Sequence, residues 1–190
     1  GEMAHTAGLV VNRVASICSP IDLMASGHAI DRGFNKAIYA RMFLSTMKPR
    51  AMQKLQQFPG LFDPHELMLA NTLYAFDDVF TAPLHGFKNT QDYWSRASAK
   101  PLMQDIRLPA LALNACNDPF VPAHSLPQKS DVSSSVTLWH PQQGGHVGFA
   151  SGALPGHVLD MPEAVGRWLM AASGQAVSGQ KNAQRLNANG

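Results

Sequence analysis

Three short apolar runs constrain the fold of this chain more than any other feature of its sequence. The runs are Leu9 to Ile17, Ala110 to Ala115 and Val136 to His140. Each has the length of a buried strand and is followed by a turn former: Ser19-Pro20, Asn117-Asp118-Pro119 or Gly144-Gly145. Because helix-length segments separate the runs, the pattern predicts a parallel sheet and therefore an α/β fold.

Helical periodicity dominates the segment between the first two runs. Apolar residues recur at helical spacing from 34 to 58, and Pro49 is predicted to divide this stretch into two helices, because proline is poorly tolerated inside one. Pro64 is expected to open a helix that runs through Leu69. A further helix is predicted over Thr90 to Ala99, with Thr90 as its N-cap.

The sequence also predicts structure for three further segments of the chain. Asp22 to Gly27 is interpreted as a loop or a short turn of helix. The last helix is predicted over Pro162 to Ala172, with Val165, Trp168 and Leu169 on one face. Residues 175–190 contain small and polar residues without apolar periodicity, so we interpret them as a disordered tail.

Composition excludes several classes of protein. Hydrophobic residues make up 45% of the 190 residues and charged residues 15%, which is a globular balance. The net charge of +2 is mild and the basic residues are scattered, so no nucleic-acid partner is expected.

No apolar stretch reaches the roughly 20 residues of a membrane-spanning helix, so no transmembrane segment is expected. The first residues lack the basic flank and apolar core of a signal peptide. Cys18 and Cys116 each lie in an apolar run and are interpreted as small buried hydrophobes. Together these features predict a soluble protein of the cytoplasm.

An acid and a histidine follow two of the predicted strands. Asp118 and His146 lie 28 residues apart, which leaves room for one crossover and one strand between them. Carboxyl ends of parallel strands meet at one edge of a sheet, so both side chains can project from the same edge. A carboxylate that orients an imidazole is half of a nucleophilic catalytic triad. The glycines beside His146 let the backbone turn tightly there.

Five segments together resemble the YheT-like α/β-hydrolases, the group that includes the ABHD-type esterases. They are Ser19-Pro20-Ile21-Asp22-Leu23, Phe76-Asp77-Asp78, His85-Gly86-Phe87, Asn117-Asp118-Pro119-Phe120 and Gly144-Gly145-His146-Val147-Gly148-Phe149. They occur in the family's order and cover roughly residues 9 to 172. The strand-end motifs are common to many α/β-hydrolases, whereas the combination with Phe-Asp-Asp and His-Gly-Phe is more specific.

The resemblance implies a role for each matching segment. Asp118, rather than Asn117, corresponds to the triad acid, and His146 corresponds to the triad base. Residues 1–174 would form part of an α/β-hydrolase domain, with residues 34–99 inserted as a helical cap. The implied activity is hydrolysis of carboxylic esters, with a small acyl or lipid-like ester as substrate and no cofactor.

The sequence departs from the family pattern in one respect. The family's chain order is Ser, Asp, His, yet no Gly-x-Ser-x-Gly occurs anywhere in this chain. Three strands would also leave an apolar sheet edge exposed. We therefore expect the chain to be the carboxy-terminal half of a longer serine hydrolase and to be inactive alone. The alternative is a catalytically inactive binding or interaction module of the same fold, and the upstream DNA would distinguish the two.

Other candidate residues favour structural interpretations. Asp77 and Asp78 are adjacent and so point in different directions, which favours capping or ion pairing over paired-carboxylate chemistry. His85 is interpreted as structural, and His146 on its own could be merely a turn histidine. His140, His146 and His157 match no compact zinc pattern, so no metal is expected.

Methionines gather in the predicted helical segment, at Met42, Met47, Met52 and Met68. They fit either ordinary core packing or a pliable pocket for an apolar substrate, and the sequence leaves both interpretations open.

Overall fold

The computed structural model describes residues 6–152 and 156–171. The chain forms two compact units. Unit 1 comprises residues 1–21 and 99–190, and unit 2 comprises residues 22–98. The helical segment expected at 34–99 overlaps unit 2, which begins earlier, at Asp22. The tail expected at 175–190 lies outside the described residues.

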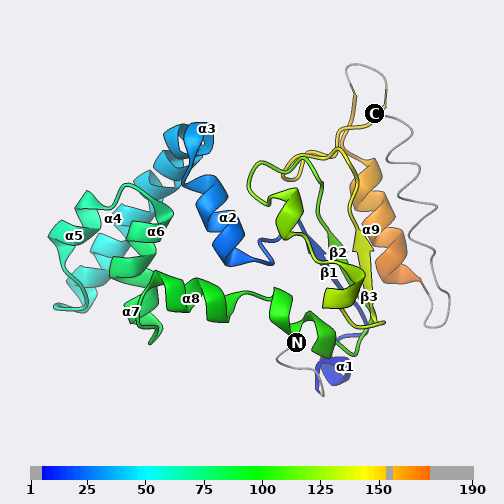
Figure 1. Cartoon of the computed structure of the whole chain (residues 1–190), viewed down its shortest axis with the longest axis horizontal. Coiled ribbons are helices and arrows are strands. Elements are labelled where there is room, and N and C mark those ends of the chain that lie inside the picture. Colours follow the sequence, from blue (N-terminus) through cyan, green and yellow to red (C-terminus); the bar gives the residue numbers. More distant parts are fainter. Residues whose placement is uncertain (1–5, 153–155, 172–190) are drawn as a thin grey trace. The chain divides into compact units, whose positions relative to one another are not determined.

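Unit 1 contains a parallel three-stranded sheet, as the sequence predicts (Figure 1). Its strands are β1 (Val14–Ile17), β2 (Ala110–Leu113) and β3 (Val136–Trp139), in that order. The four residues of β2 are all buried, because this central strand is covered on both faces. Among the described residues of this unit, short 3-10 helices cover Lys100–Asp105, Ala123–Ser125 and Lys129–Asp131.

The first strand is shorter than predicted, and the expectation of a strand from Leu9 was wrong. Leu9 and Val10 belong to helix α1 (Ala7–Val10) and are 86% and 74% exposed. Pairing starts where the Val14 amide donates to the Pro109 carbonyl oxygen at 3.1 Å. Pro109 has no N–H to donate in return, so the ladder between β1 and β2 cannot extend further in this direction.

Helix α9 (Asp160–Met170) packs against the sheet (Figure 1). It buries Ala164, Val165 and Trp168 in a cluster that includes Leu111 and Leu113 of β2. Leu169 was predicted on this face but is 39% exposed. The buried face is centred on Ala164, Val165 and Trp168, so Leu169 lies at its edge.

The opposite face of the sheet is covered by a smaller cluster. Met103, on the 3-10 helix Lys100–Asp105, packs there with Ile21 and Ala112. Alternate residues of β2 therefore enter different clusters, with Ala112 on one face and Leu111 and Leu113 on the other.

Unit 2 is entirely helical in its regular elements. They are α2 (Leu23–Ile30), α3 (Gly33–Asn35), a π-helical turn (Lys36–Ala40), α4 (Arg41–Gln57), α5 (Pro64–Leu69), α6 (Leu73–Phe76), a second π-helical turn (Asp77–Thr81), α7 (Ala82–Leu84) and α8 (Thr90–Ala97). The segment beginning at Asp22, expected as a loop or a short turn of helix, forms the eight-residue helix α2. Asp22 is its N-cap, and Asp22 Oδ1 accepts from the Ala25 amide at 3.0 Å.

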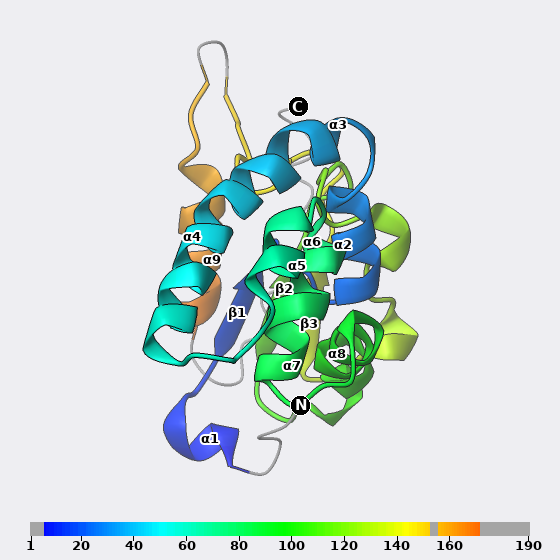
Figure 2. The same ribbon diagram turned by 90° about the vertical axis from the view of Figure 1, so that its left-hand side faces the viewer.

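Helix α4 continues through Pro49, so the predicted division into two helices was wrong (Figure 2). An interior proline costs about 3 kcal/mol. Leu44 and Ala51, on either side of it, are both buried in one cluster with Leu67 of α5 and Phe76 of α6. Burial on both sides holds the helix together across the proline.

Two helix starts test the capping predictions. Pro64 opens α5 as predicted, and Asp63 caps it by accepting from the His65 amide at 2.7 Å. The N-cap of α8 is Asn89, whose Oδ1 accepts from the Asp92 amide at 2.9 Å, so the prediction of Thr90 was wrong by one residue. Thr90 is fully buried and its hydroxyl donates to the Tyr74 carbonyl at 2.8 Å, which keeps it out of the capping position.

Trp94 of α8 lies at the centre of an aromatic group in unit 2. Its ring meets His28 at a centroid distance of 5.6 Å and Tyr74 at 5.3 Å. A Cβ at Gly27 would lie 2.3 Å from the Trp94 ring, so only glycine lets α2 approach this closely. The indole Nε1 donates to Asp77 Oδ2 at 2.8 Å.

Asp77→Asn is expected to remove part of the pH dependence of stability. Burial raises the pKa of Asp77 above its ordinary value of 3.8. Between the unfolded and folded pKa the native state binds more protons, so the Asp77 contribution to stability falls as pH rises through that range. Urea unfolding of wild type and variant over a pH series measures the effect.

The wild type should lose stability relative to the variant as pH rises from about 4. Asp105→Asn, which alters a 59% exposed side chain in unit 1, is the matched control. A stability difference between wild type and Asp77→Asn that stays constant with pH would contradict this account.

Candidate active site

Asp118 lies in the turn that follows β2, and its carboxylate is held by the backbone. Oδ1 accepts from the amides of Phe120 at 2.8 Å and Val121 at 3.3 Å. The residue is only 5% exposed. Asn114, at the end of β2, ties this turn to the segment after β1. Its Nδ2 donates to the carbonyl oxygen of Ser19 at 3.1 Å. One carboxylate oxygen is thus fixed, and Oδ2 remains for another partner.

His146 supplies that partner from the turn after β3. Its Nδ1 lies 3.0 Å from Asp118 Oδ2. The Asp118 side chain is 0% exposed, whereas the His146 side chain is 38% exposed. The structure therefore has the predicted contact between these two residues across neighbouring strand ends.

The contact has a defined chemical consequence. An imidazole that donates through Nδ1 to a carboxylate keeps Nε2 as an acceptor. Phe120 fixes the ring further, since its own ring meets that of His146 edge-on at a centroid distance of 4.7 Å. The arrangement can accept a proton at Nε2 and stabilise the resulting imidazolium.

Two glycines make the His146 turn possible. A Cβ at Gly144 would lie 2.5 Å from the Phe149 ring and 2.8 Å from Ala115 Cβ. Gly145 has φ +58°, a left-handed conformation that glycine adopts without steric cost. The tight turn expected from the glycine pair is present, and it packs the histidine loop onto the end of β2.

Asn117 is a site residue that sequence reasoning considered only as an unsuitable triad acid. Its Oδ1 accepts from the Gly145 amide at 2.9 Å, and its Nδ2 donates to Gln143 Oε1 at 2.7 Å. It therefore joins the acid turn to the histidine turn. Its position beside Asp118 was visible in the sequence, but its partners depend on how the two turns meet.

Asn117→Ala is expected to loosen the His146 turn. A net loss of about one hydrogen bond should speed hydrogen exchange of the Gly145 amide by about 2- to 10-fold. Asn117→Asp, which retains an acceptor oxygen for that amide, is the control and should leave the exchange rate close to that of wild type. Equal protection in Asn117→Ala and wild type would rule out this bridging role.

Cys18 lies near the pair but is unsuited to act as a nucleophile. It is 2% exposed, directly after β1. Burial, and secondarily the charge of Asp118, raise the pKa of its thiol to about 11, so it stays protonated at neutral pH. Cys116 is only partly buried, so the expectation of two buried cysteines holds for Cys18 alone; neither forms a disulfide.

The other predicted residues make contacts of their own. Asp77 accepts from Trp94, and Asp78 accepts from the Thr90 amide at 2.9 Å, so both have structural roles within unit 2, as expected. His85 is exposed at the end of α7. Burial lowers the pKa of His140. Within residues 6–152 and 156–171, no group of three potential metal ligands comes together.

The parallel sheet with its covering helix defines an α/β protein, and an acid–histidine pair lies at the carboxyl ends of β2 and β3. The sequence is 29% identical to YheT of Escherichia coli (strain K12), which is named as an esterase, over 85% of this chain and 48% of that protein. It is 26% identical to phospholipase ABHD3 of Mus musculus, over 77% of this chain and 39% of that protein.

The chain is also 31% identical to monoacylglycerol lipase of Saccharomyces cerevisiae, over 70% of this chain and 31% of that protein. These matches confirm the resemblance: the chain is a relative of the YheT-like, ABHD-type hydrolases. It spans half or less of the length of these relatives. No family model matches the chain. No solved structure matches it either.

Proposed function

We propose that this chain is the carboxy-terminal half of a serine hydrolase that acts on carboxylic esters. The observation that carries the proposal is the 3.0 Å contact between His146 Nδ1 and the buried carboxylate of Asp118. The names of the relatives, esterase, phospholipase and monoacylglycerol lipase, support an ester substrate. Residues 1–174 would then form part of the hydrolase domain, with the helical segment 34–99 as its cap.

The proposed mechanism assigns one task to each residue of the pair. A serine oxygen from upstream sequence attacks the ester carbonyl while His146 Nε2 takes its proton. His146 then gives the proton to the leaving alcohol as the ester C–O bond breaks, which leaves the acyl group on the serine. In the second half, His146 takes a proton from the water that attacks this acyl-serine and returns it to the serine oxygen as the acid leaves. Asp118 accepts from Nδ1–H throughout and stabilises the imidazolium. The nucleophile and the oxyanion donors come from outside this chain.

The relatives also narrow the proposed substrate. Phospholipids and monoacylglycerols both carry acyl esters, so we propose a small acyl or lipid-like ester. The preferred acyl length is to be read from rates on p-nitrophenyl esters of increasing acyl length.

Sequencing the DNA upstream and expressing the extended protein tests the proposal. An in-frame Gly-x-Ser-x-Gly with ester turnover in the extended protein, and none in the 190-residue chain, is the expected result. A genuine start site at the beginning of this chain, with no upstream nucleophile, would instead favour the inactive binding module.

A further inference from the structure

One continuous helical stretch of unit 2 has an unusual charge pattern. Residues 33–57, which comprise α3, the first π-helical turn and α4, contain no acidic residue. The stretch carries five basic residues, Lys36, Arg41, Lys48, Arg50 and Lys54. A helical surface of one sign attracts a partner of opposite charge.

The same stretch exposes large apolar side chains in a regular row. Phe34, Ile38 and Met42 follow one another at intervals of four and are 71%, 45% and 50% exposed. Such spacing places side chains on one helix face. Since exposed apolar side chains next to basic ones are typical of helices that lie on lipid surfaces, the row and the charge point to the same partner.

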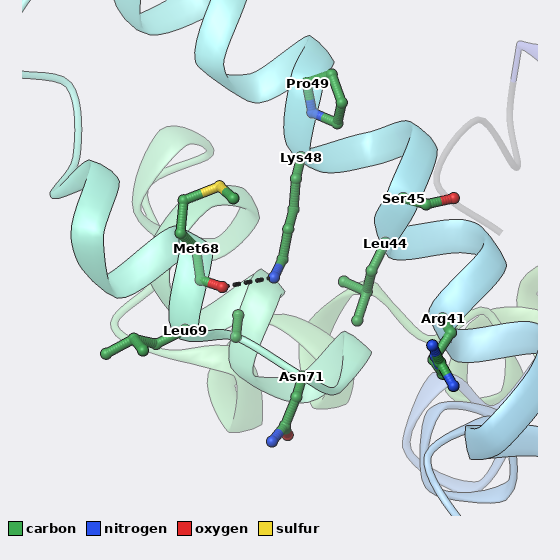
Figure 3. Close-up of a pocket in the computed structure, with 9 residues that line it drawn as sticks. Arg41, Leu44, Ser45, Lys48, Pro49, Met68, Leu69 and Asn71 are labelled. Carbon is green, nitrogen blue, oxygen red and sulfur yellow. Dashed lines mark hydrogen bonds between the residues drawn. The ribbon is translucent and has the colours of Figure 1, made fainter.

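A shallow pocket of about 370 Å³ lies along α4 (Figure 3). Arg41, Ser45 and Lys48 line it from α4, and Met68 and Leu69 line it from the end of α5. Lys48 reaches across the pocket, where its Nζ donates to the Met68 carbonyl oxygen at 2.8 Å. Met68 and Leu69 are 57% and 61% exposed, so apolar surface borders the two cations.

The charges of the pocket are not neutralised within the described part of the chain. There, neither Arg41 nor Lys48 forms an ion pair with a carboxylate. The single hydrogen bond of Lys48 to a neutral carbonyl fixes its position and leaves its charge uncompensated. The pocket therefore offers two cations to an anionic group whose apolar portion contacts Met68 and Leu69.

We propose that this surface docks unit 2 onto an anionic lipid surface, with a lipid phosphate between Arg41 and Lys48 and with Phe34, Ile38 and Met42 against the acyl boundary. The surface lies wholly within unit 2 and is independent of Asp118 and His146. The proposed function can therefore fail without affecting this inference, and the reverse is also true.

Co-sedimentation of the 190-residue chain with vesicles tests the proposal. The expected result is binding to phosphatidylcholine vesicles that contain about one-third phosphatidylserine, and little binding to pure phosphatidylcholine. Arg41→Gln with Lys48→Gln should weaken binding about 25-fold, at roughly fivefold per basic residue. Phe34→Ser with Ile38→Ser should weaken it on the order of tenfold or more.

Two control variants distinguish binding through this surface from nonspecific electrostatic attraction to the vesicles. Lys88→Gln with Lys129→Gln removes the same charge from exposed positions elsewhere and should bind like wild type. Arg41→Lys with Lys48→Arg keeps both charges and should also retain binding. Circular dichroism checks that each variant folds. If Arg41→Gln with Lys48→Gln unfolds, Phe34→Ser with Ile38→Ser still tests the proposal, because it leaves the hydrogen bond from Lys48 to the Met68 carbonyl intact.

Several results would overturn the proposal. One is equal binding of the wild type to both kinds of vesicle. Another is a loss of binding in the Lys88→Gln, Lys129→Gln control as large as that in Arg41→Gln with Lys48→Gln. A third is unchanged binding in a folded Phe34→Ser, Ile38→Ser variant. Capture of inorganic phosphate without vesicle binding would assign a site for soluble anions instead. If the wild type does not bind vesicles and Phe34→Ser with Ile38→Ser changes the oligomeric state, the row of Phe34, Ile38 and Met42 would instead be a self-association surface.

Discussion

Asp118→Asn is expected to lower kcat for ester hydrolysis by about 10⁴-fold in the proposed extended enzyme, by analogy with other orienting acids. Asparagine keeps the size of the side chain but can present an N–H to Nδ1, which favours the wrong histidine tautomer. The buried position of Asp118, with one oxygen already held by two backbone amides, leaves little freedom to compensate. Turnover of a p-nitrophenyl ester measures the effect.

Asp105→Asn is the matched control for this measurement. It makes the same chemical change on an exposed side chain of unit 1, whose charged neighbour is Arg107 at 3.9 Å. It should leave turnover essentially unchanged. Near-full turnover by Asp118→Asn would refute the assignment of Asp118 as the orienting acid.

Trp94→Ala is expected to destabilise unit 2 by about 3–5 kcal/mol, the usual cost of removing a fully packed aromatic side chain. Trp94 is 3% exposed, contacts the rings of His28 and Tyr74, and fills the space against Gly27. Its loss also leaves the partly buried carboxylate of Asp77 without the indole donor. The free energy of unfolding in urea measures the change.

Phe58→Ala serves as the comparison because Phe58 is also aromatic but is 52% exposed at the end of α4. It should cost less than about 1 kcal/mol. Similar losses in the two variants would contradict the central packing role of Trp94.

The sequence predicted the parts of the fold that depend on local pattern. The apolar runs at Ala110 and Val136 became the central strand and an edge strand of a parallel sheet, because a buried strand needs continuous apolar residues. The rule that carboxyl ends of parallel strands meet at one sheet edge also predicted that Asp118 and His146 lie together. Both predictions follow from the geometry that all parallel sheets share and need no knowledge of how particular side chains pack.

The failures have a common physical cause, which is tertiary contact. Pro49 does not break α4, because Leu44 and Ala51 are buried on both sides of it. Thr90 does not cap α8, because its hydroxyl is engaged by Tyr74. Asn117 bridges two turns whose approach is decided only when the strands pair. No local pattern contains these contacts.

The most direct test of the account is the tautomer of neutral His146, read from the nitrogen shifts of its ring in the 190-residue chain. We expect a proton on Nδ1, directed at Asp118, and an unprotonated Nε2 able to receive a proton from a nucleophile. Asp118→Asn should abolish this preference. A neutral ring protonated at Nε2 in the wild type would contradict the proposed base and, with it, the hydrolase assignment.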